Sequence, residues 1–215
     1  MDIKALAQKY EPYIIERRRY FHAHPELSFK EWETTKALVA EFEKMGMEIQ
    51  TFPDYPGLIA TLDTGKPGRT VMLRADIDAL PVKEGTGLDF ASQNEGVMHA
   101  CGHDNHMAML LGAAHILLEK KDELKGKVKF LLQSGEEMAC GAKYYVDHHI
   151  LDGVDAIFGQ HIWGTLDAPY VCVASGNRMA SCDNFTIRVK GLQSHGSAPQ
   201  DGHDAIVAAS AIVMA

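Results

Sequence analysis

Long apolar runs and long basic runs are both missing from this sequence. No apolar stretch approaches the roughly 20 residues that a membrane-spanning helix needs, and the start of the chain has no apolar core of a secretory signal. The formal net charge at pH 7 is -8, without the basic patch on which nucleic-acid binding depends. We therefore expect a cytoplasmic protein that binds neither membranes nor nucleic acid, and whose partner is a small molecule or a peptide.

Cysteine is scarce, whereas histidine is abundant. The chain of 215 residues is 46% hydrophobic and 23% charged, which is ordinary for a globular protein. Without an export signal, reduced thiols with metal-binding or catalytic roles are favoured over disulfides. Of the 11 histidines, several lie beside Asp, Glu or Cys, and imidazole is the commonest metal ligand, so a metal site is worth testing. The four cysteines are Cys101, Cys140, Cys172 and Cys182.

Helical and extended patterns alternate along residues 1–180. Periodic apolar positions predict helices over 2–20, 104–120 and 139–150, and a further helix that starts near Ser28 in a capping box with Glu31 and stops at Gly46. Strands are expected at 57–62, 69–75, 127–133 and 155–161. This alternation predicts an α/β fold in which a largely parallel sheet is covered by helices on both faces.

The pattern changes near Asp183. Residues 184–190 alternate as a half-exposed strand, and residues 204–215 form an apolar helix capped by Asp204. We place a domain boundary there, with a catalytic domain at 1–180 and the beginning of a small α+β domain at 181–215. Because about 35 residues are too few to bury a core, we expect both domains to be incomplete.

Polar residues follow each predicted strand. In an open parallel sheet, ligands bind outside the carboxyl ends of the strands, so these side chains are expected at one edge of the sheet. Each segment alone has a structural explanation, such as a strand cap or a solvated surface pair. Four segments that deliver carboxylates, a thiol and imidazoles to the same edge instead predict a metal centre. They contribute Asp76 and Asp78, Cys101 and His103, Glu136 and Glu137, and His161.

The same segments carry a family signature. The chain resembles the hippurate hydrolase and indole-acetyl-amino-acid hydrolase branch of the aminoacylase and carboxypeptidase family of two-metal hydrolases, over essentially its whole length and as the N-terminal portion. The matching stretches are RRRYFHAHPELSFKEWET (17–34), LRADIDALPVKE (73–84), MHACGHDNHMAMLLGAAHIL (98–117), QSGEEMACGAK (133–143), GQHIW (159–163) and GLQSHGSAPQDGHDAIVAAS (191–210).

The resemblance implies a role for each matching site residue. Glu136 would be the general base. Asp76 and Asp78 would support the site by holding the metal ligands, without binding the metal themselves. His195 would reach the substrate from a small lid domain and polarise its carbonyl, in a full-length homodimer assembled through that lid. Two divalent ions (zinc, manganese or cobalt) would be held by Cys101, His103, Glu137 and His161.

The implied activity is metal-dependent hydrolysis of the amide bond in N-acyl amino acids, whether hippurate-like, N-acetylated or small peptides. The chain departs from the family at Ser134-Gly135, where Pro-Ala is usual, and at Gln200, where His is frequent. A further histidine ligand of the family has no counterpart here. Two alternatives therefore stay open: a catalytically inactive chain that binds metal incompletely, and an amidase with Cys101 as nucleophile. His106 and His115 are interpreted as packing or surface residues.

Overall fold

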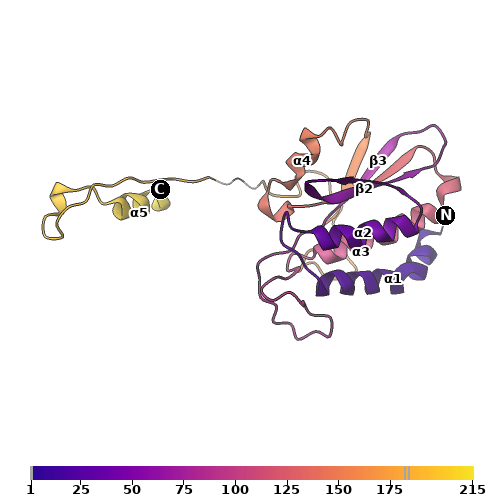
Figure 1. The fold of residues 1–215 in the computed structure, drawn as a ribbon, viewed down its shortest axis with the longest axis horizontal. Coiled ribbons are helices and arrows are strands. Elements are labelled where there is room, and N and C mark those ends of the chain that lie inside the picture. The colour runs from indigo at the N-terminus through magenta and orange to yellow at the C-terminus, as the bar shows by residue number, and fades with distance from the viewer. Residues whose placement is uncertain (1, 182, 184) are drawn as a thin grey trace. The chain divides into compact units, whose positions relative to one another are not determined.

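The computed structural model describes residues 2–181, 183 and 185–215, so that Cys182 lies outside the described residues. The chain divides into two compact units, Met1–Ala174 and Ser175–Ala215, which are described separately. The first unit is built around a five-stranded sheet (Figure 1). The domain assignment to 1–180 and 181–215 stays a prediction. Among the described helices, none is long and apolar enough to cross a bilayer.

The sheet is mixed rather than largely parallel. β3 pairs in parallel with β4 and β5, whereas β2 pairs antiparallel with both β1 and β4. The α/β class is thus confirmed, but the sequence did not predict β1, which forms a tight hairpin with β2 and adds an antiparallel edge. The strand order is β1 (Glu48–Phe52), β2 (Tyr55–Asp63), β4 (Lys127–Gln133), β3 (Thr70–Asp76) and β5 (Ala156–Gly159).

Helices lie on both faces of the sheet, as expected. α2 (Trp32–Lys44) and α3 (His103–Glu119) pack on one face, and α1 (Ile3–Ala23) packs against α3 on the outside (Figure 1). The short helix α4 (Gly141–Asp147) covers the other face. Apolar side chains are buried on both faces of the sheet and stabilise it. The polar residues that follow the strands therefore lie at one edge of the sheet. The larger core cluster includes Phe21, Leu38, Phe42, Leu58, Met107, Leu111, Phe130 and Leu132, and the smaller includes Phe52, Ile59, Met72, Leu131 and Tyr145.

The start of α2 differs from the prediction. The helix begins at Trp32, and the expected capping box is wrong because the first-turn amides of Glu33 and Thr34 donate to the carboxylate of Glu26 instead. The hydroxyl of Ser28 instead donates to Asp78, and the Glu31 carboxylate is buried against Ser134. The predicted stop is confirmed, since Gly46 follows the helix with a left-handed φ of +69°.

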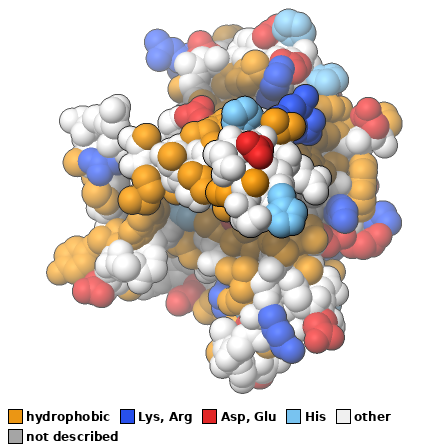
Figure 2. Space-filling model, turned by 90° about the vertical axis from the view of Figure 1, so that its left-hand side faces the viewer, with side chains coloured by type: hydrophobic (Ala, Val, Ile, Leu, Met, Phe, Trp, Pro, Cys, Tyr) orange, Lys and Arg blue, Asp and Glu red, His pale blue; other side chains and the backbone are white. Residues whose placement is uncertain are grey.

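The second unit has little regular structure apart from α5 (Ala205–Met214). The predicted cap is confirmed, since the carboxylate of Asp204 accepts hydrogen bonds from the first-turn amides. The predicted strand is wrong for residues 185–190, because no described segment pairs with them, and residue 184 lies outside the described residues. As expected for so short a unit, large apolar side chains stay at the surface (Figure 2); they include Phe185, Ile206, Val213 and Met214.

Candidate metal centre

The carboxyl ends of β3 and β4 meet at one edge of the sheet. Asp76 ends β3 and lies opposite Gln133, which ends β4. The chain then continues from β3 to Asp78 and from β4 into the short 3₁₀ helix η2 (Glu136–Met138). The start of α3 and the segment after β5 reach the same edge, so seven of the eight predicted site residues come together. Their functional roles stay predictions.

His103 stands at the centre of this group. It opens α3, and the preceding Gly102 takes a left-handed φ of +87°. The Nδ1–H of His103 donates to the backbone carbonyl of Asp78 at 2.9 Å. The other ring nitrogen, Nε2, is buried and has no hydrogen-bond partner. A backbone carbonyl that accepts the Nδ1–H, fixes the imidazole and leaves Nε2 free is the usual arrangement of a metal-binding histidine.

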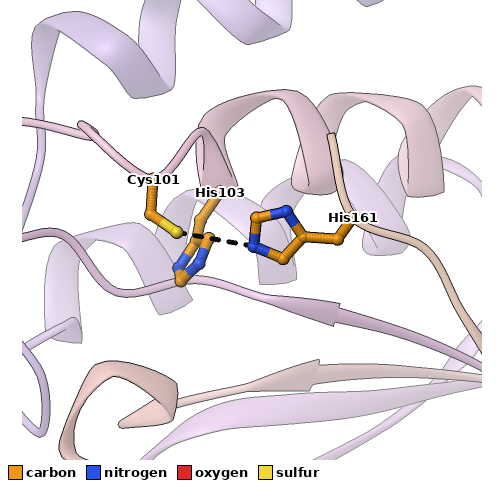
Figure 3. Close-up of side chains that lie close together, drawn as sticks. All are labelled: Cys101, His103 and His161. Carbon is orange, nitrogen blue, oxygen red and sulfur yellow. Dashed lines mark hydrogen bonds between the residues drawn. The ribbon is translucent and has the colours of Figure 1, made fainter. Parts of the chain in front are cut away.

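Two further candidate ligands face His103, namely Cys101 from just before α3 and His161 from the segment after β5. The Sγ atom of Cys101 lies 3.4 Å from Nε2 of His161, and both side chains point toward the ring of His103 (Figure 3). The ligand atoms of these three residues all lie within 4.8 Å of one another. Glu136 and Glu137 form a second such group with His103. The four predicted ligands therefore fall into two groups that share His103.

His106 is the residue that the sequence interpretation missed. It is buried, and its Nδ1 is hydrogen-bonded to Asp76, while its Nε2 accepts a hydrogen bond from the backbone N–H of Ile162 at 3.0 Å. Because both ring nitrogens are occupied, His106 acts as a support that fixes the backbone next to His161. The available signal was its position three residues after His103, on the same face of α3.

Asp76 is held as a buried carboxylate. Arg74 donates to it at 2.8 Å, and His106 is bonded to its other oxygen. Burial opposes ionisation, but the hydrogen bond from His106 and the charges of Arg74 and His103 outweigh it and hold the pKa of Asp76 well below its usual range. Asp76 thus holds His106 and Arg74 in place, and the supporting role that the resemblance implied for it stays a prediction.

The buried carboxylates of the site favour the binding of a cation. Burial opposes protonation of His103, yet the surrounding carboxylates raise its pKa. Burial and neighbouring carboxylates also raise the pKa of Glu137, and they raise the pKa of the Cys101 thiol to about 12. Buried oxygens of Asp78 and Glu137 have no hydrogen-bond partner. A divalent cation would supply the missing partner and favour the thiolate, so these residues fit a metal.

His195 lies in the second unit. Its Nδ1 is 2.8 Å from the hydroxyl of Ser197 and also accepts the Ser197 backbone N–H at 3.2 Å. The turn is exposed, and the predicted role of His195 on the substrate carbonyl stays a prediction. Gln200 lies nearby in the 3₁₀ helix η3 (Pro199–Asp201).

Known proteins resemble the chain over its full extent. The N-acyl-L-amino acid amidohydrolase of Geobacillus stearothermophilus is 40% identical over 213 residues, which is 99% of this chain and 58% of the relative. The N-acetylcysteine deacetylase of Bacillus subtilis is 44% identical over 201 residues, 93% of this chain and 53% of the relative. The chain thus spans about half the length of the curated relatives it matches.

A solved structure and a family profile agree with these relatives. The Bacillus subtilis YXEP protein, described as a dinuclear metal binding peptidase from the M20 family, has 44% identity and a TM-score of 0.70, and the match covers 77% of this chain and 45% of that chain. A Staphylococcus aureus crystal structure matches 100% of this chain and 58% of that chain, with 40% identity and a TM-score of 0.83. The profile of peptidase family M20/M25/M40 matches residues 72–213. Because that match covers well over half of the chain, the protein belongs to peptidase family M20/M25/M40.

Proposed function

We propose that this chain carries the metal centre of an amidohydrolase that cleaves the amide bond of N-acyl amino acids. One observation carries the proposal: the unpartnered Nε2 of His103 lies 3.7 to 3.9 Å from carboxylate oxygens of Asp76, Glu136 and Glu137. If such a site held two divalent ions of zinc, manganese or cobalt, they would polarise a scissile carbonyl and lower the pKa of an attacking water. The residues that would hold them are Cys101, His103, Glu137 and His161.

Glu136 is the proposed general base. It opens η2 directly after Gly135. Its side chain is 39% exposed, whereas that of Glu137 is 18% exposed, so Glu136 is the more accessible of the two to a substrate. Glu136 would take a proton from the attacking water and deliver it to the leaving amine, since one carboxylate can serve both steps. Asp78 would hold His103 and the η2 segment in place during this exchange.

The names of the relatives support the proposed substrate class. They describe an N-acyl-L-amino acid amidohydrolase, a thermostable carboxypeptidase and an N-acetylcysteine deacetylase. We propose that this chain contributes to the same class of reaction, with His195 on the substrate carbonyl and with the complete protein as a homodimer. The cytoplasmic location stays a prediction.

A cysteine nucleophile is the competing mechanism. The 3.4 Å approach of Cys101 to His161, rather than to His103, gives the thiol an imidazole from a separate segment. Against it, burial and the nearby carboxylates raise the pKa of the Cys101 thiol to about 12, whereas nucleophilic cysteines have lowered pKa values. A thiolate in this environment requires a cation beside it, which favours the metal-dependent reaction.

The test is hydrolysis of a panel of N-acetyl, N-benzoyl and indole-acetyl amino acids by the chain loaded with zinc, manganese or cobalt. Replacement Glu136→Gln keeps the size of the side chain and removes the base, so the rate should fall by about 100-fold or more. Glu33→Gln, at an exposed position on α2, is the matched control and should keep the rate. Chelation with EDTA should abolish hydrolysis, and added metal should restore it.

Three results would contradict parts of this proposal. A Glu136→Gln variant as fast as the parent would remove Glu136 from the mechanism. Hydrolysis that survives EDTA would favour the cysteine nucleophile. Metal uptake without any hydrolysis would favour the alternative that this chain, which covers about half of its relatives, binds metal but is inactive by itself.

A further inference from the structure

The segment before α2 carries a fully buried carboxylate, that of Glu31. It contacts residues 134–137, the metal-site loop, which contain the glutamate pair. Glu31 has 0% exposure. The hydroxyl of Ser134 lies 2.8 and 2.7 Å from its two oxygens, and the backbone N–H of Gly135 donates to it at 3.0 Å. Ser134 and Gly135 directly precede the glutamate pair. Burial raises the pKa of Glu31 to about 7, although the bonds from Ser134 and Gly135 oppose the rise.

A second contact from the same segment reaches the other side of the glutamate pair. The hydroxyl of Ser28 donates to Oδ2 of Asp78 at 2.7 Å. The same oxygen accepts the backbone N–H of Glu137 at 3.0 Å. Glu31 therefore holds the residues before Glu136, while Ser28, through Asp78, holds the amide of Glu137.

Phe29 stands between Ser28 and Glu31 in the sequence and packs against Gly135 of the same loop. Its backbone has a φ of +63°, a conformation that a bulky residue rarely adopts. Its ring lies over Gly135, where a Cβ atom would come within 2.2 Å of a ring carbon. Gly135 itself has a φ of +72°. A strained residue persists where its surroundings fix it, and such residues cluster at functional sites.

Packing alone does not explain Glu31. A fully buried position that only fills space is served better by an apolar side chain, because a buried carboxylate must have its hydrogen bonds supplied by the protein. Here the donors are a hydroxyl and an amide of the loop that leads into Glu136 and Glu137. The hydrogen bonds that the buried carboxylate needs therefore stabilise one conformation of that loop.

We propose that Ser28, Glu31 and Ser134 form a clamp that fixes the segment 134–137 in the conformation that presents Glu136 and Glu137 to the site. These are positioning residues, and they lie beyond the predicted site. The inference rests on the proposed function only in so far as Glu137 binds metal.

Hydrogen exchange on the metal-free chain tests the clamp directly. In Glu31→Leu, which has a similar side-chain volume, the acceptors of the Gly135 N–H and of the Ser134 hydroxyl are both lost, so the amides of Gly135 and Glu137 should exchange about 10-fold faster or more, while β4 and α3 keep their parent rates. Ser134→Ala removes only the hydroxyl donor and should give a smaller change in the same direction. Glu33→Leu, in the first turn of α2 and 74% exposed, is the matched control and should leave all rates unchanged.

Cobalt titration of the same variants adds a readout that a general loss of stability would not give. For the folded protein, Glu31→Leu should weaken cobalt binding by about 10- to 100-fold, the usual effect of removing a support behind a ligand. Unchanged exchange at Gly135 and Glu137 in both variants would overturn the clamp, as would acceleration spread evenly over the sheet. If the parent chain takes up no cobalt, the proposed function fails, while hydrogen exchange still decides the clamp.

Discussion

Gly141, the first residue of α4, lies directly against the backbone that leads to the glutamate pair. A Cβ atom at this position would come within 2.0 Å of the carbonyl oxygen of Ser134 and 2.6 Å of the carbonyl carbon of Gly135. Non-bonded heavy atoms need roughly 3.5 Å, so the two segments must separate by about 1 Å or more to admit a methyl group. Both contacts are backbone atoms, which cannot rotate away as a flexible side chain would.

Two effects of the Gly141→Ala replacement oppose each other. Helix propensity favours alanine by at most about 1 kcal/mol, and less at the first position of a helix. Overpacking in a well-packed region costs about 1 to 3 kcal/mol. We therefore expect a net loss of about 1 to 2 kcal/mol in the free energy of unfolding, together with a displaced segment at 134–135.

Urea unfolding followed by circular dichroism measures this loss. Gly164→Ala is the matched control, because a Cβ atom there meets nothing within 4 Å and the backbone is not in the left-handed region. The control should be neutral or slightly stabilising. A Gly141→Ala chain as stable as the parent, or more stable, would show that helix propensity wins and would refute the close packing of α4 on the metal-site loop.

Two other replacements test separate parts of the structure. His106→Ala removes the acceptor of the Ile162 N–H, so cobalt affinity should fall by about 10- to 100-fold in a competition titration; an unchanged affinity would contradict the support of His161 by His106. Burial opposes the ionisation of Glu41, but hydrogen bonds from Lys44 and Tyr13 outweigh it and lower its pKa. Its stabilisation is therefore present above the ordinary value of 4.5 and is lost as the pH falls through the lower folded value. Glu41→Gln should flatten the fall in unfolding free energy between about pH 5 and pH 3, and an unchanged slope in denaturant titrations would contradict this.

The buried parts of the fold could be predicted from the sequence because their patterns are local. β4 has the predicted bounds, and its KVKFLLQ run carries the apolar density of a central strand. β1, with the sequence EIQTF, is mostly exposed and is held by its hairpin partner, so its own residues give little signal. The start of α2 was misplaced because Ser28 and Glu31 bond to residues far along the chain rather than to their own helix.

The candidate site divides in the same way. Cys101, His103 and the glutamate pair could be selected because their residue types suit metal ligands and because they adjoin strands and helices of a parallel unit. His106 and Glu31 could not, because their meaning depends on partners that only the fold brings near: Ile162 is 56 positions from His106, and Ser134 is 103 positions from Glu31. Supports of this kind become visible only when the tertiary contacts are known.

One buried histidine, His103, is shared by two groups of side chains that we propose as ligands of the metal centre. Native mass spectrometry of the chain loaded with zinc or cobalt tests this most directly, with His103→Ala and the exposed-site control His148→Ala measured alongside. We expect divalent metal on the parent and on His148→Ala, and its loss from His103→Ala because both groups share His103. No metal on the parent chain, or the same metal count in His103→Ala, would contradict it.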